Sequence, residues 1–397
     1  MIPFFKLIRL PNLLIMAFTQ YMVRWFLLIP IMELKRHDLD YSLLDVQMTE
    51  IDFFLLVLST VMIGAAGYII NDYFDVRIDG VNRPDTNVVG KKVKRRVAMG
   101  AHMAINFIGA GLGIYLSWKY NFFRVGASLF IAAPALLWIY STNLKRRFLI
   151  GNVVIALLSA IVPILVGLFE IPNILRSYPE VVGNGCLNLI EASWFIGLIA
   201  LFAFILSLIR EIIKDVEDFE GDFEYGCKTM PIVLGIARTK WVLATIIIVF
   251  AGFLTWIQNA EFITPAAKIV ISAPESANGQ RVIATETIGK KTYYAIIGCG
   301  QAIVEVPQHK SYIITFPDNS TKTIESAGVE SNWTSAMYCI FLIILPLLYL
   351  AYRVLNAKGK KDWHFCSVLV KVIMVTGISY LFLYAHQLHN MIAGNVS

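Results

Sequence analysis

The chain is poor in charge. Of its 397 residues only 16% are Asp, Glu, Lys or Arg, whereas 57% are hydrophobic. About a quarter of the residues are charged in soluble globular proteins, so the composition argues against that class and predicts a polytopic membrane protein. A net charge of +6 would suggest a nucleic-acid partner in a soluble protein. Here the basic residues lie between apolar segments, and we expect no nucleic-acid partner.

Cysteine is scarce and unpatterned. The five cysteines form no CxxC motif and no Cys/His pairing, which argues against zinc and redox chemistry. We also expect no cleavable leader, because Met1 to Leu10 leads into an apolar segment without a small-residue cleavage pattern. We therefore expect the first helix to serve as its own insertion signal. The cysteines, interpreted as packing residues, are Cys186, Cys227, Cys299, Cys339 and Cys366.

Long apolar runs are abundant. Nine of them have roughly the length of about 20 residues that a helix needs to cross a bilayer. They lie near 11–31, 52–70, 98–117, 123–140, 149–169, 192–210, 240–257, 334–352 and 365–385. The sequence therefore predicts an all-α polytopic membrane protein with nine transmembrane helices in a bundle.

Lys and Arg are distributed unevenly over the short connections between these runs. One side of the membrane holds 21 of them and the other holds five. By the positive-inside rule, the N-terminus then lies in the cytoplasm and the C-terminus outside. We expect an integral protein of a bacterial or archaeal inner membrane.

The stretch from Asn71 to Asp79 departs from the apolar pattern. It places three carboxylates directly after an apolar run, where lipid tolerates charge only at a cost. If the helix continues, Asp72, Asp75 and Asp79, at offsets 0, 3 and 7, share one narrow face. Mg²⁺, which prefers oxygen ligands, is the natural ion to place among them.

The same spacing occurs again in Asp215, Asp218 and Asp222, each 143 residues after its counterpart. A single acidic helix end is more often a solvated cap. Two clusters with identical spacing, on the same predicted cytoplasmic side, instead suggest two half-sites that face each other across a shared metal and diphosphate.

Further motifs accompany the clusters: Asn82-Arg83-Pro84, Tyr140, Leu144-Lys145, Gly151-Asn152 and the run from Gly226 to Pro231. Together with the clusters they resemble the UbiA family of intramembrane prenyltransferases. The likeness covers about 1–257 and 334–385 and leaves out the segment between. It implies Mg-dependent transfer of a polyprenyl group from an allylic prenyl diphosphate to a lipophilic acceptor, with release of diphosphate, in a water-poor cavity that contacts membrane lipid.

The resemblance also implies roles for individual residues. The first metal-diphosphate half-site is Asn71, Asp75 and Asp79, the second is Asp218 and Asp222, and Asp72 and Asp215 are auxiliary members of the catalytic clusters. Arg83, Lys145 and Lys228 are expected to contact diphosphate, and Tyr140 to lie near the reacting carbon. For these four, snorkelling to the interface is the competing explanation. The basic run 91–96 either sets topology and attracts anionic lipid or helps to hold diphosphate.

The acceptor is less sharply indicated. The motif from Arg210 to Asp222 looks most like that of geranylgeranylglyceryl phosphate geranylgeranyltransferases, which favours the hydroxyl of a prenylglyceryl phosphate. C-prenylation of an aromatic acceptor, as in quinone biosynthesis, stays an alternative. A third, remote alternative is that the protein transports ions or lipid, in which case prenyl diphosphate would stay intact.

Residues 258–333 differ in kind from the rest. Short β-branched runs at 268–271, 281–285, 293–297, 302–306 and 312–316 are separated by Gly, Pro, Asn and Asp, the pattern of a small antiparallel β unit. We therefore expect three parts: transmembrane helices 1–7 in 1–257, an extracytoplasmic β-rich insert in 258–333, and helices 8 and 9 with a tail in 334–397. The sequence indicates no partner for the insert.

Overall fold

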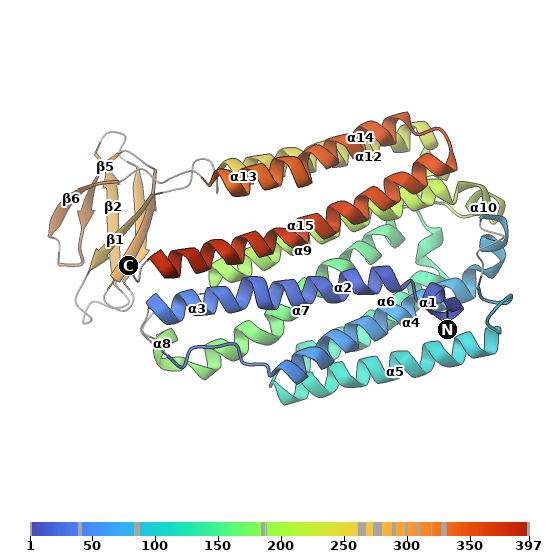
Figure 1. The fold of residues 1–397 in the computed structure, drawn as a ribbon, viewed down its shortest axis with the longest axis horizontal. Coiled ribbons are helices and arrows are strands. Elements are labelled where there is room, and N and C mark those ends of the chain that lie inside the picture. The colour runs from blue at the N-terminus through green and yellow to red at the C-terminus, as the bar shows by residue number, and fades with distance from the viewer. Residues whose placement is uncertain are drawn as a thin grey trace.

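A computed structural model gives the fold of the chain (Figure 1). It describes residues 2–38, 42–82, 88–183, 187, 189–260, 267–272, 280–287, 291–297, 301–307, 310–318, 320–326 and 332–394. Within these ranges, nine helical segments are long and apolar enough to cross a membrane. This confirms the nine predicted runs and an integral, multi-pass membrane protein.

The spanning segments lie side by side in a bundle (Figure 1). The first span combines α2 (Leu10–Val23), the π-helical turn η1 (Arg24–Leu28) and α3 (Ile29–Asp38). The next six spans are single helices: α4 (Glu50–Asn82), α5 (Arg95–Lys119), α6 (Phe123–Thr142), α7 (Ile150–Ser177), α9 (Ile190–Glu217) and α12 (Ile236–Gln258). The eighth combines α13 (Trp333–Cys339), η5 (Ile340–Ile344) and α14 (Leu345–Asn356), and the ninth is α15 (Lys360–Gly394). Short helices near their ends are α1 (Ile2–Leu7), η2 (Leu144–Arg146), α8 (Pro179–Gly183), α10 (Phe219–Glu224) and α11 (Met230–Leu234).

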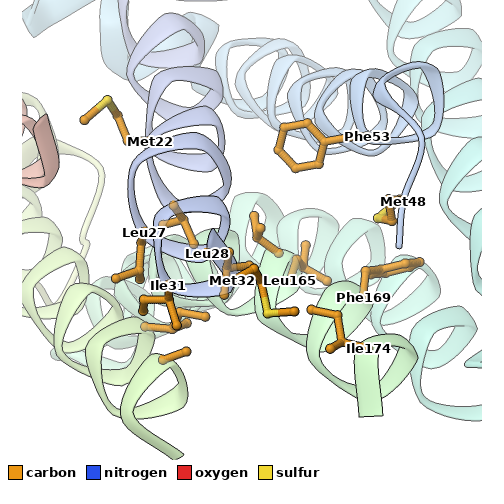
Figure 2. Close-up of a cluster of buried hydrophobic side chains, with 14 of the residues drawn as sticks. Met22, Leu27, Leu28, Ile31, Met32, Met48, Phe53, Leu165, Phe169 and Ile174 are labelled. Atoms are coloured by element: carbon orange, nitrogen blue, oxygen red, sulfur yellow. The ribbon is translucent and has the colours of Figure 1, made fainter. Parts of the chain in front are cut away.

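Close packing holds the spanning helices together, since lipid gives them no hydrophobic reason to associate. Figure 2 shows one buried cluster, in which Leu28 and Met32 of the first segment face Leu165 and Phe169 of α7. A second cluster joins α9, α12, α14 and α15. Small residues allow the closest approaches: a Cβ at Gly113 would lie 2.3 Å from the Phe130 ring.

One charged side chain is buried in the first segment, at the π-helical turn. The Arg24 guanidinium is 1% exposed, its Nη1 lies 2.8 Å from Oε1 of the fully buried Glu170, and its Nη2 donates to the Met48 carbonyl at 2.5 Å. The other carboxylate oxygen of Glu170 accepts from the backbone N–H groups of Gln47 and Met48. This network fastens the connection before α4 to α7.

Replacing Glu170 by Gln should therefore destabilise the protein by about 3 kcal/mol or more, because the buried Arg24 loses its buried counter-charge and keeps only the exposed Glu50, 3.1 Å from its Nη2. Thermal unfolding in detergent measures this. Glu191→Gln, at an exposed acid of α9, is the matched control and should unfold as the wild type does. If Glu170→Gln unfolded at the wild-type temperature, the pair would have no role in stability.

The β-rich insert forms at one end of the bundle. Its strands are β1 (Ala267–Ser272), β2 (Arg281–Glu286), β3 (Thr292–Ile296), β4 (Gln301–Val306), β5 (Ser311–Thr315) and β6 (Thr321–Glu325). They pair antiparallel as β1-β4 and as β3-β2-β5-β6, around one apolar core. The five predicted strands are confirmed, and β6 was missed because Thr321 to Glu325 is polar and alternates weakly.

The insert lies at the end of the bundle opposite α10 (Figure 1). Helix α12 ends at Gln258 and α13 begins at Trp333. The division into three domains and the extracytoplasmic side of the insert stay predictions.

Cysteine labelling tests the sidedness. In a background without the native cysteines, Gly80→Cys at the end of α4 and Lys322→Cys on β6 should react with an impermeant reagent from opposite sides of the membrane. Both positions are exposed. Labelling of both from the same side would show that the number of spans between them is even.

Candidate active site

The first aspartate cluster lies on one uninterrupted helix. α4 continues from its apolar run through Asn82, two residues before Pro84, which cannot continue a helix without losing a hydrogen bond. Asp72, Asp75 and Asp79 therefore share a helix face, as predicted from their spacing. Asp75 is buried, with 3% of its surface exposed.

The second cluster lies on an interrupted helix. Asp215 belongs to the last turn of α9, Asp218 stands at the break, and Asp222 lies in α10. The backbone N–H of Asp222 nevertheless donates to the Asp218 carbonyl at 3.1 Å, so the helical pitch is nearly kept across the break. Asp215 accepts a hydrogen bond from Asn152 Nδ2 at 2.8 Å, which ties this cluster to the start of α7.

Asn82 and Gly221 join the two clusters. The backbone N–H of Gly221, one residue before Asp222, donates to Asn82 Oδ1 at 2.8 Å. A Cβ at Gly221 would lie 2.5 Å from Asn82 Nδ2, so this approach requires glycine. Lys360 Nζ donates to the Asn82 carbonyl at 2.5 Å and thereby satisfies the end of α4.

Lys145 enters the site from the turn between α6 and α7. Its Nζ forms an ion pair with Asp75 Oδ2, and a Cβ at Gly151 would lie 2.8 Å from the Lys145 backbone, so glycine permits the tight turn. The backbone N–H of Lys228 donates to the Arg146 carbonyl at 2.8 Å. The predicted Leu144-Lys145, Gly151-Asn152 and Gly226 to Pro231 motifs thus meet in one place.

The surroundings of the site disfavour the ionised form of Asp222. Burial raises the pKa of Asp222 to about 7; Lys145 opposes this shift, while the nearby carboxylates of Asp218 and Asp75 add to it. Burial also disfavours the charge on Lys145, but Asp75 outweighs that effect and raises the Lys145 pKa. Acids whose ionisation is this costly gain from a divalent cation.

The side-chain oxygens of the two clusters are possible ligands for a metal ion. Asn71 Oδ1 is buried without a hydrogen-bond donor and lies one residue before Asp72, so it is an oxygen in need of a partner. In the described part of the chain, no three His, Cys, Asp or Glu side chains form a ready metal cluster. The donor set of carboxylate and amide oxygens still suits Mg²⁺, which takes only one or two carboxylates and completes its shell with water and phosphate oxygens.

A cavity of about 300 Å³ opens beside the clusters within the bundle. Its polar end includes Asn71, Tyr140 and Glu211, and its remaining wall is mostly aliphatic and aromatic, with Phe130 and Leu165 among the lining residues. A hydrocarbon chain can lie along such a wall, with its polar end toward the aspartates.

The structure places the predicted site residues as follows. The six aspartates and Asn71 come from the C-terminal parts of α4 and α9 and from α10. Lys145 pairs with Asp75, Tyr140 lines the cavity, and Lys228 is exposed, while Arg83 lies outside the described residues. Arg95 of the basic run lies 4.7 Å from the Tyr73 ring centroid.

Two cations near the site were not predicted from the sequence. Arg9 forms an ion pair with Asp72 at 2.9 Å, and Lys371 lines the cavity from α15. Lys371 could have been found, because it is the one charged residue within the apolar run 365–385.

Residues 45–273 match the model of the UbiA prenyltransferase family. The chain belongs to this family. The match includes both aspartate clusters, leaves out the first segment and α13 to α15, and ends in the insert, slightly beyond the boundary expected at 257. UbiA membership therefore has its strongest support in the segments that carry the carboxylates.

Individual proteins with similar sequence have been described. The digeranylgeranylglyceryl phosphate synthase of Pyrococcus horikoshii is 35% identical over 206 residues, which are 52% of this chain and 63% of that protein. The enzyme of the same name from Pyrococcus abyssi is 34% identical over 247 residues, 58% of this chain and 80% of that protein. A solved structure of a UbiA homolog from Archaeoglobus fulgidus bound to GPP and Mg²⁺ is 13% identical, covers 96% of this chain and 99% of its own, and has a TM-score of 0.47.

The junction between the clusters gives a test of the site. Gly221→Ala should lower activity at least about tenfold, since a Cβ overlaps the Asn82 side chain and displaces Asp222. Gly80→Ala is the matched control, because a Cβ there meets nothing within 4 Å. Rates with prenyl diphosphate measure the effect. Equal rates for the two variants would show that the Asn82 contact does not position Asp222.

Proposed function

We propose that the protein transfers a prenyl group from an allylic prenyl diphosphate to a hydroxyl of a lipophilic acceptor and releases diphosphate. The observation that carries this proposal is the convergence of two aspartate clusters and Lys145 beside the polar end of an apolar cavity inside the bundle. The aspartate clusters and Lys145 suit a diphosphate group, and the apolar cavity suits a prenyl chain. A soluble hydrolase would not need the two together.

Asn71, Asp75 and Asp79 would hold Mg²⁺ on one side of the diphosphate, and Asp218 and Asp222 on the other. Mg²⁺ supplies positive charge that offsets the charge of the leaving group. The unpartnered Asn71 oxygen and the raised pKa of Asp222 support this assignment. Asp72 and Asp215 are held by Arg9 and Asn152, so they serve to orient the clusters.

The chain's own residues account for the remaining chemistry. The bond between the allylic carbon and the diphosphate oxygen breaks, and its electron pair leaves with the diphosphate. Lys145, held at Asp75, faces that departing charge. The apolar cavity wall excludes water from the allylic cation. The acceptor hydroxyl oxygen then bonds to the carbon, and its proton passes to the released diphosphate.

For the acceptor, we propose the hydroxyl of a prenylglyceryl phosphate. Two relatives carry the name of digeranylgeranylglyceryl phosphate synthases, and forming an ether needs only a hydroxyl close to the cation, without ring activation. The polar cavity end also holds several cations that suit a charged headgroup. We place the reaction on the cytoplasmic side, where the excess of Lys and Arg predicts the aspartates to lie.

Both clusters should be essential. Asp75→Ala and Asp218→Ala are each expected to reduce turnover by a factor of about 10² or more, because charge on the leaving group is no longer offset from both sides. Diphosphate release from labelled prenyl diphosphate, with Mg²⁺ and an acceptor panel, measures this. Glu220→Ala, at an exposed acid between Asp218 and Asp222 of the second cluster, should stay active.

Two results would contradict the proposal. A variant of either cluster that keeps most of the activity would rule out the pair of half-sites. A wild-type protein that binds prenyl diphosphate but returns it intact would indicate transport instead of transfer. Size-exclusion profiles confirm that each variant remains folded.

A further inference from the structure

Lys371 is a cation inside the membrane without a matching acid. It lies six residues inside the apolar run 365–385, which is about 9 Å along the helix. It is half-buried and lines the cavity. Among the described residues, no acid lies within ion-pair distance of its Nζ. Ionisable side chains at such positions are costly and usually functional.

Other cations line the same cavity. Arg9, Arg210 and Lys214 contribute to its wall together with Lys371, and Glu211 is the one acid among the described lining residues. Glu211 already serves two of them, since it lies 2.6 Å from Arg210 and 3.7 Å from Lys214. Arg9 is matched by Asp72, which does not line the cavity.

The charges of the lining side chains indicate which kind of ligand the cavity would bind. Arg9 is matched by Asp72, Arg210 and Lys214 share Glu211, and Lys214 is also close enough to Asp218 to be attracted by it. Among the described residues, Lys371 is therefore the lining cation that no acid matches. A phosphomonoester, which carries about 1.5 to 2 negative charges near pH 7, would supply the anion that Lys371 lacks. A quinone or another neutral acceptor would leave Lys371 uncompensated in a poorly solvated cavity.

The cationic side chains lie beside the diphosphate site, and Asn71 is common to that site and to the cavity. Lys145 and the six aspartates do not line the cavity, whereas Lys371, Arg210 and Lys214 come from α15 and α9 on its wall. The chain thus offers two adjoining anion positions: one at the aspartates, and one on the cationic wall formed by Arg210, Lys214 and Lys371.

We propose that this cationic wall binds the phosphomonoester of the lipid acceptor, with Lys371 as the residue that selects phosphorylated acceptors. The inference rests on the proposed function, because it assigns the second substrate of that reaction. The phosphate on the cationic wall and the prenyl chain along the apolar wall would together fix the acceptor hydroxyl near the allylic carbon. Selection follows because acceptors without phosphate leave the half-buried Lys371 unpaired.

The test compares Lys371→Met, Lys371→Arg and the wild type with two acceptors, geranylgeranylglyceryl phosphate and the same lipid without phosphate. Lys371→Met should raise the KM for the phosphorylated acceptor at least about tenfold, the loss of one charge-assisted contact. The KM for prenyl diphosphate and for the phosphate-free lipid should not change, and Lys371→Arg should restore most of the affinity. Without prenyl diphosphate, geranylgeranylglyceryl phosphate should raise the Tm of the wild type more than that of Lys371→Met.

Lys361→Met is the matched control, since it removes an exposed cation near the start of the same helix, and it should behave as the wild type. A higher KM for prenyl diphosphate in Lys371→Met would assign the cationic wall to the donor and overturn the inference. An equal rise for both acceptors would indicate a structural effect and overturn it as well. If the wild type prenylates only phosphate-free acceptors, this inference and the proposed acceptor fail while prenyl transfer itself stands; if it prenylates none, the proposed function fails with them.

Discussion

The ion pair between Lys145 and Asp75 is the interaction on which the organisation of the site depends. It joins the turn after α6 to the end of α4, at a point where Asp222 approaches from α10. Because the pair is buried, neither side chain tolerates the loss of the other. The approach of η2 to α7 at Gly151 and of α10 to α4 at Gly221 brings these charged groups together.

The buried ionisable side chains at the two ends of the bundle differ in how completely they are paired. At the end near the insert, Arg24 is matched by Glu170, by Glu50 and by a backbone carbonyl, and this network stabilises the fold. At the other end Asp75 pairs with Lys145, whereas Lys371 on the cavity wall is matched by no acid among the described residues. Unmatched charge in a poorly solvated place is costly, and it persists where a substrate completes the balance.

Much of this organisation could be predicted from the sequence. The nine spans follow from hydrophobicity alone, and five strands follow from β-branched runs, because both signals are local. The spacing of the aspartates predicted one helical face in α4 correctly. The spacing did not predict the break at Asp218, because local helix propensity does not show where packing against neighbouring helices ends a helix.

Contacts between distant segments could not be derived from the sequence. The hydrogen bond from Gly221 to Asn82 joins residues 139 positions apart, and Arg9 reaches Asp72 across 63. Such pairs depend on how helices pack, which composition does not encode. Lys371 is a different case: its charge inside an apolar run was visible, but the cations that share its cavity come from α2 and α9.

The attachment of the β unit has a consequence for how the protein can vary. α12 and α14 pack against each other, and Gln258 at the end of α12 donates a hydrogen bond to the Ala336 carbonyl at 3.0 Å. The two points where the unit joins the bundle are therefore adjacent with or without it. Since loop-closure entropy grows only slowly with length, this hairpin tip can exchange a short turn for a folded module with little effect on the helices beneath it.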